Sequence, residues 1–226
     1  MKKAIVIIFH LLLSNSFFSQ QIKVTRDFGV WGEVNIEKKL SKEIEINLGQ
    51  QLRYYSDATS FDDYIIDFGG KYKMNKNFKL GANLRFTHDA KRWKEAENNY
   101  RYNLDLNYKA NISKKIKLYY RLRYQETYVD LFSEYQTTNI HYSGFRNKIK
   151  IKYNLNKRNK LFLSGELFRL KETFRSPYFN KIPFYLGDEI KTKIGNVSCS
   201  FGYEQEINTD YPLSFFFIRL AYTIKL

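Results

Sequence analysis

The stretch NYRYNLDLNYKA, residues 99–110, gives the clearest indication of the fold class. Its apolar and aromatic side chains occupy the even positions, Tyr100, Tyr102, Leu104, Leu106, Tyr108 and Ala110. Its polar side chains occupy the odd positions, Asn99, Arg101, Asn103, Asp105, Asn107 and Lys109. Successive side chains of a β-strand point to opposite faces, whereas helical spacing mixes the two sets. The stretch therefore predicts a strand with one apolar and one polar face.

The same separation of apolar and polar side chains recurs along the chain. It is found in residues 44–54, 78–87, 116–125, 145–153 and 216–226. Each run has about the length that a tilted strand needs to cross a bilayer. After residue 20 no apolar run is long enough to cross as a helix, so a membrane-embedded form must be a closed barrel.

The connections between these runs alternate in length. Short polar turns are predicted at residues 38–42, 75–77, 111–114, 155–159 and 195–196. Longer polar loops are predicted at residues 56–61, 90–98, 129–141, 173–183 and 207–212. This alternation is typical of outer-membrane proteins. The predicted fold is all-β, an antiparallel transmembrane β-barrel with short periplasmic turns and longer extracellular loops.

The number of strands follows less directly from the pattern. Eleven runs are found from Phe28 onward, although residues 185–206 divide poorly. Bacterial barrels normally have an even number of strands. We expect about ten to twelve, and twelve if residues 21–26 form an irregular first strand. A soluble β-sandwich is the alternative, favoured by the mean hydropathy of −0.53. The regular run length, the loop asymmetry and the alternating last run oppose it.

Residues 1–20, MKKAIVIIFHLLLSNSFFSQ, have the pattern of a cleaved secretory signal peptide. Lys2 and Lys3 precede an apolar core that is short for a membrane-spanning helix. We expect residues 21–226 to form a single barrel domain in the outer membrane of a Gram-negative bacterium. Cys199 is the only cysteine, so no disulfide forms within the chain.

The formal net charge is +15, and many basic residues share the polar face of the predicted strands. The lumen-facing candidates are Arg85, Arg101, Arg121, Arg123, Arg146, Lys148, Lys150 and Lys152. Asp67, Asp105 and Glu45 are candidate internal counter-charges, too few to neutralise this wall. Either the lumen is lined for anions, as charged rings line pores, or paired side chains plug it. A barrel of this size is narrow, which favours a plugged or very narrow lumen.

Catalysis is the alternative from a different functional class. A lipid hydrolase needs a histidine beside a nucleophilic serine and an acidic or amide partner. His88 adjoins Asp89, and His141 is near Ser143 and downstream of Glu134. Proximity in sequence alone does not make a catalytic site, so we assign no catalytic, cofactor or metal residue.

Several segments carry a resemblance to a known family. They are DFGVW (residues 27–31), EKKLSK (37–42), YRLRYQ (120–125), the cluster Arg146–Asn147–Lys148, and residues 64–80 with Gly69, Tyr72 and the Asn75–Lys76–Asn77 turn before Phe78. They resemble the family called domain of unknown function 2490. The resemblance covers most of residues 21–226 and implies an outer-membrane-like barrel, with no assigned activity and no catalytic residues.

The predicted function is thus an outer-membrane barrel, either structural or a narrow pore with a basic lumen. An outer-membrane lipid-modifying enzyme and a soluble periplasmic β-sandwich binding protein are the alternatives. The expected partners are outer-membrane lipid and lipopolysaccharide, with small anions as candidate ligands. Export argues against nucleic acid, no pattern requires a cofactor, and none specifies an oligomeric state.

Overall fold

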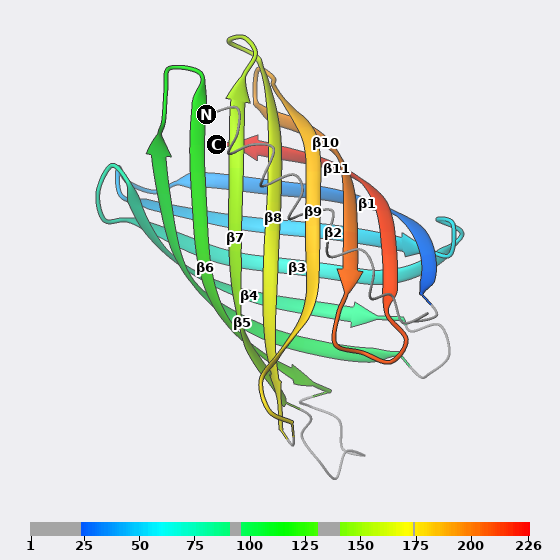
Figure 1. Cartoon of the computed structure of the whole chain (residues 1–226). Coiled ribbons are helices and arrows are strands. Elements are labelled where there is room, and N and C mark those ends of the chain that lie inside the picture. Colours follow the sequence, from blue (N-terminus) through cyan, green and yellow to red (C-terminus); the bar gives the residue numbers. More distant parts are fainter. Residues whose placement is uncertain (1–23, 91–95, 131–140, 174) are drawn as a thin grey trace, which may run out of the picture.

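The computed structural model describes residues 24–90, 96–130, 141–173 and 175–226. They form one closed β-barrel of eleven strands (Figure 1). The strands are β1 (Thr25–Lys39), β2 (Ile44–Tyr55), β3 (Ser60–Lys73), β4 (Phe78–Asp89), β5 (Glu97–Asn111), β6 (Ile116–Val129), β7 (His141–Asn154), β8 (Asn159–Glu172), β9 (Tyr178–Lys191), β10 (Gly195–Glu206) and β11 (Leu213–Lys225). The predicted signal peptide lies outside the described residues. Within those residues no helix is long and apolar enough to cross a membrane.

Strands that follow one another in sequence pair antiparallel around the barrel. The predicted barrel is therefore confirmed, and the alternative of two packed sheets is wrong. One end, the short-turn rim, carries the tight turns at residues 40–43, 74–77, 112–115, 155–158 and 192–194. The other end, the long-loop rim, carries the connections after β2, β4, β6, β8 and β10. In Figure 1 the front strands run across those behind them, as tilted strands of a closed barrel do.

The barrel is closed by a parallel pair, β1 with β11, in register from Thr25 opposite Leu213 to Glu37 opposite Lys225. Eleven strands lie within the predicted range, but the expected even number is wrong. Residues 25 and 26 begin β1 itself rather than a separate strand. With an odd number, the first and last strands run in the same direction and must pair in parallel. Parallel pairing is slightly weaker per residue, yet it leaves no free sheet edge.

The stretch that divided poorly in sequence forms β9 and β10, which pair antiparallel. The loop predicted to reach Pro183 ends earlier, because β9 begins at Tyr178. The turn predicted at Gly195 is also displaced, since Gly195 opens β10 and the turn is at residues 192–194. A Cβ on Gly195 would lie 1.8 Å from the carbonyl oxygen of Thr223. Close approach to β11, and not turn geometry, requires glycine at this position.

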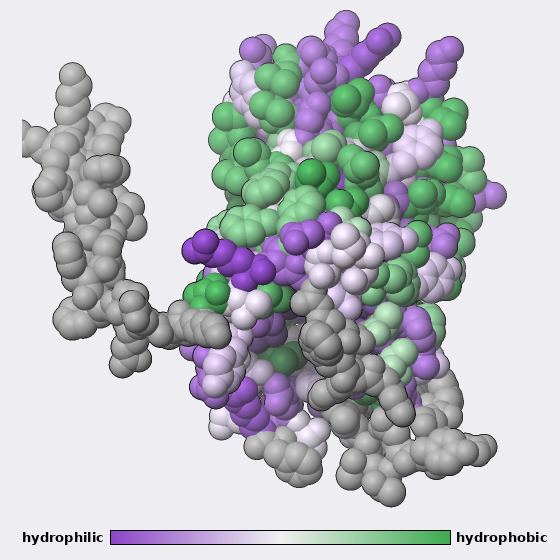
Figure 2. Space-filling view, turned by 90° about the vertical axis from the view of Figure 1, so that its right-hand side faces the viewer, coloured by the Kyte–Doolittle hydropathy of each residue, from purple (hydrophilic) through white to green (hydrophobic). Residues whose placement is uncertain are grey.

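The two faces of the barrel wall differ as the alternation predicts. Leu104 points outward with 54% of its surface exposed, while its neighbour Asn103 points inward with 1% exposed. Exposed large apolar side chains occur on every strand except β6. Figure 2 shows the apolar side chains as a broad band, with hydrophilic side chains above it and below it. The outer wall is thus apolar and the interior largely polar.

Candidate functional site: the barrel interior

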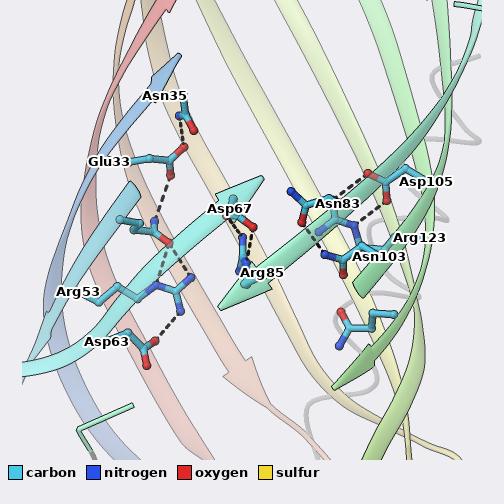
Figure 3. Close-up of polar contacts among 12 residues, drawn as sticks. Glu33, Asn35, Arg53, Asp63, Asp67, Asn83, Arg85, Asn103, Asp105 and Arg123 are labelled. Atoms are coloured by element: carbon cyan, nitrogen blue, oxygen red, sulfur yellow. Dashed lines mark hydrogen bonds and ion pairs between the residues drawn. The ribbon is translucent and has the colours of Figure 1, made fainter. Parts of the chain in front are cut away.

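Two ion pairs connect neighbouring strands at mid-height inside the barrel (Figure 3). Arg85 on β4 binds both carboxylate oxygens of Asp67 on β3, at 2.8 and 2.7 Å. Arg123 on β6 binds Asp105 on β5 in the same way, at 2.7 and 2.8 Å. Each arginine stands directly opposite its partner in the strand register. Such two-point contacts fix both side chains across the lumen wall.

A third contact joins the two strands that close the barrel. The guanidinium Nε of Arg219 on β11 donates to the carboxylate of Glu33 on β1 over 3.0 Å. The amide of Gln51 on β2 donates to the same carboxylate over 3.2 Å. The polar contacts therefore continue through the parallel seam.

Glu166 on β8 is shared by three cations. Its carboxylate accepts hydrogen bonds from Arg121 at 2.7 Å and from Arg146 at 2.9 Å. The Nζ of Lys148 lies 3.6 Å away, and the glutamate side chain is only 1% exposed. One carboxylate with three basic partners leaves a local surplus of positive charge.

Aromatic rings fill another part of the interior. Trp31 stacks on Phe217 with ring centroids 3.7 Å apart, and Tyr185 meets Phe217 edge-on. Phe215 and Phe162 complete this buried cluster, which comes from β1, β8, β9 and β11. The rings bring apolar packing to an interior that is otherwise polar. We call the aromatic cluster, the ion pairs and Glu166 together the central belt.

The central belt separates two cavities. The long-loop cavity has a volume of about 730 Å³, and the short-turn cavity has about 710 Å³. The two share no lining residue, and Glu33, Asp105 and Glu166 line neither. Among the described residues, packed belt side chains therefore lie between the parts of the lumen that these two cavities occupy.

The predicted basic residues are distributed over these three regions. Arg85, Arg101 and Arg146 line the long-loop cavity, and the Nε of Arg101 donates to Thr127 Oγ1 over 2.8 Å. Arg123 lies in the central belt. The remaining predicted residues, Arg121, Lys148, Lys150 and Lys152, line the short-turn cavity.

The predicted counter-charges are joined by others that the sequence analysis did not single out. Asp67 and Asp105 take part in the ion pairs above, and Glu45 lies 3.1 Å from Lys71. Glu33, Glu166 and Glu189 were missed. The alternation of Leu161, Leu163 and Leu167 with Phe162, Ser164 and Glu166 was the available signal for Glu166. The ion pairs themselves needed the strand register.

The histidines do not form a catalytic arrangement with serine among the described residues. His141 Nε2 lies 3.5 Å from a carboxylate oxygen of Glu126. His88 Nδ1 lies 3.0 Å from the side-chain oxygen of Asn98. Among the described residues, no hydrogen bond joins either histidine ring to a serine hydroxyl, and this includes the hydroxyl of Ser143. Glu134 lies outside the described residues. The observed partners orient the rings without supplying a nucleophile.

Three carboxylates meet at the mouth of the long-loop cavity. Oxygen atoms of Asp62, Asp63 and Asp89 lie within 4.8 Å of one another. Arg53 donates to Asp63 over 3.1 Å and neutralises part of this charge. The cluster gives the long-loop cavity a more acidic entrance than the short-turn cavity has.

Comparison with known proteins gives a family but no activity. No curated protein matches the chain. The profile of a family described as "protein of unknown function (DUF2490)" matches residues 28–211. This match spans most of the barrel, from β1 to the last long-loop connection. The chain therefore belongs to the DUF2490 family.

Proposed function

We propose that the protein is an outer-membrane β-barrel whose lumen is closed at mid-height, with a structural role rather than that of an open channel. The observation that carries the proposal is the apolar outer wall. Leu84, Phe68 and Leu186 are each at least 56% exposed, and they lie on different strands. Soluble monomers rarely expose apolar patches larger than a few hundred Å². A lipid bilayer is the solvent that suits such a wall.

The signal-peptide pattern and the alternating last strand support delivery to the outer membrane. In that membrane the short turns face the periplasm and the longer loops face outward. The partners are then membrane lipid and lipopolysaccharide along the apolar wall.

The central belt supports the closed lumen. Its arginines and carboxylates are joined by hydrogen bonds of 2.7 to 3.0 Å, and Phe217 is fully buried. Ion passage requires these contacts to break and reform. Among the described residues the two cavities share no lining residue, which supports a lumen that is interrupted between them.

A lipid-modifying enzyme is the weaker alternative. The pair of His141 and Glu126 lies near the long-loop rim, but among the described residues no serine is bonded to it. Loss of lipid hydrolysis on His141→Ala, in a wild type that hydrolyses lipid, would restore this alternative.

Fractionation and bilayer recording test the proposed function together. The protein should appear in the outer-membrane fraction, with heat-modifiable migration in detergent gels. In planar bilayers the wild type should conduct little or no current. Removing a belt pair, Arg123→Ala with Asp105→Ala, should open a measurable conductance because it leaves a void and no unpaired charge.

The matched control is Lys181→Ala with Glu204→Ala, a pair that lines the long-loop cavity outside the central belt. It should leave the conductance at the wild-type level. Recovery as a soluble periplasmic monomer would refute the membrane location, and a large wild-type conductance would refute the closed lumen.

A further inference from the structure

The short-turn cavity has an uneven charge. Eleven basic side chains line it, against the two carboxylates of Glu43 and Glu45. The basic residues are Lys39, Lys42, Lys71, Lys73, Lys76, Lys79, Lys109, Arg121, Lys148, Lys150 and Lys152. Like charges confined in a partly dehydrated space repel strongly. Glu37, Glu166 and Glu189 lie outside the lining and pair with Lys71, Arg121, Lys148 and Lys152, so the surplus charge lies mainly on the other lining lysines.

The excess of positive charge over carboxylates is clearest in the inner part of this cavity. The Nζ of Lys150 lies 3.8 Å from the centroid of the Phe162 ring. Among the described residues no carboxylate lies within 4.0 Å of this ammonium group, and the same holds for Lys109. A cation over a ring gains some stabilisation, but the ring does not neutralise its charge.

The neighbouring cations are held in place by the central belt. Arg121 and Lys148 stand directly opposite each other on β6 and β7 and share the carboxylate of Glu166. Lys152 is bonded to Glu189. The floor of the cavity is thus a fixed set of donors, and Lys150 is the donor left available between them.

We propose that the short-turn cavity binds a small soluble anion carrying two or more phosphate groups. A volume of about 710 Å³ lies in the range of ligand pockets, about 300 to 1,000 Å³. Lysine ammonium groups are compact point charges that suit phosphate oxygens. A monovalent anion would offset little of the surplus, whereas a diphosphate engages several lysines at once.

The route to the site follows from the same geometry. Lys42, Lys73 and Lys76 are exposed at the mouth, where a cluster of one sign attracts anions over the surface. The central belt closes the inner end. The ligand enters and leaves through the short-turn rim, so the cavity is a binding site and not half of a pore. The route rests on the closed lumen proposed above, whereas the binding site itself does not depend on the membrane location.

Calorimetric titration of the purified barrel in neutral detergent with inorganic pyrophosphate tests the inference. Pyrophosphate should bind more tightly than orthophosphate, and binding should weaken steeply between about 0.05 and 0.5 M NaCl as the charges are screened. Lys150→Gln should weaken pyrophosphate binding about tenfold, the loss of one charge-assisted contact. Lys109→Gln provides a second variant that also breaks no ion pair among the described residues.

The matched control is Lys157→Gln, which removes the same charge at the same rim from a residue that does not line the cavity. It should change the affinity less than twofold. Each variant is first checked for heat-modifiable migration. If Lys150→Gln does not fold, the pyrophosphate affinity of Lys109→Gln is the test of the inference. Absence of pyrophosphate binding by the folded wild type, or an equal loss in Lys157→Gln, would overturn the inference. Neither result touches the membrane location, which fractionation tests separately.

Discussion

At the scale of single residues, Glu166 organises the basic wall of the interior. It is nearly inaccessible, and the three cations around it come from β6 and β7. Arg121 and Arg146 both donate to this carboxylate, and Arg146 also donates to Gln125 and lies over the ring of Phe168. A buried carboxylate of this kind is hard to replace, because its removal leaves several buried charges without a partner.

Glu166→Gln should therefore destabilise the barrel by about 3 kcal/mol, the lower part of the range for a broken buried ion pair. Unfolding by urea in lipid vesicles measures this difference. Glu43→Gln is the matched control, since Glu43 is exposed in a short turn and should shift stability by less than about 0.5 kcal/mol. Equal effects of the two substitutions would show that Glu166 is solvated rather than shared.

Asn103 shows that the alternation of side chains along a strand predicts the direction of a residue but not its burial. Its inward position follows from the alternation, but its packing does not. Its amide donates to the side-chain oxygen of Asn83 over 2.8 Å, and the residue is 1% exposed. An inward-facing residue is therefore not automatically one that faces water, because neighbouring side chains can bury it.

At the scale of elements, each strand separates an apolar outer face from an inner face. β5 shows this within one segment, since Leu104 is exposed on the outer face of the barrel while Asn99 lines the long-loop cavity. A shift of one residue in the pairing would exchange the two faces. The register is therefore fixed by the solvent on each side as well as by the hydrogen bonds.

Leu104→Arg should cost about 2–4 kcal/mol, the penalty for arginine on a lipid face near the bilayer midplane. Asn99→Arg should cost far less, because this position opens onto a cavity that Asp89 and Glu97 also line. Urea unfolding of the two variants in the same vesicles gives the comparison. A larger loss for Asn99→Arg would mean that the faces of β5 are assigned the wrong way round.

At the scale of the whole molecule, the parallel seam joins the first and the last strand. β1 and β11 both start at the long-loop rim and both finish at the short-turn rim. The last strand therefore ends on the same rim as the tight turns. In the proposed membrane orientation this is the periplasmic side.

Epitope insertions test that orientation. An epitope after Asp57, in the turn between β2 and β3, should bind antibody on intact cells. An epitope after Lys76, in the turn between β3 and β4, should bind only after the outer membrane is permeabilised, because it lies on the opposite rim. Both insertions fall in turns, so the pair is matched for its effect on folding. The reverse pattern of labelling would invert the proposed orientation.

The fold class, the faces of the clearest strands and most of the turns could be predicted from the amino-acid pattern alone. These properties are local, because a period of two and a polar turn are set by adjacent residues. The positions of Arg121 and Lys148 on the polar face of their strands could be predicted for the same reason. So were Asp67 and Asp105 as counter-charges, since each shares the inward set of its own strand.

The odd number of strands, the parallel seam and the packing of the central belt follow only from the closed barrel. The pairing of Glu33 with Arg219 joins residues from the first and last strands, and no local pattern specifies that contact. The packing of Trp31 on Phe217 depends on the same seam. Closure fixes all of these at once, because the directions, tilt and stagger of the strands must be mutually consistent before the sheet can meet itself.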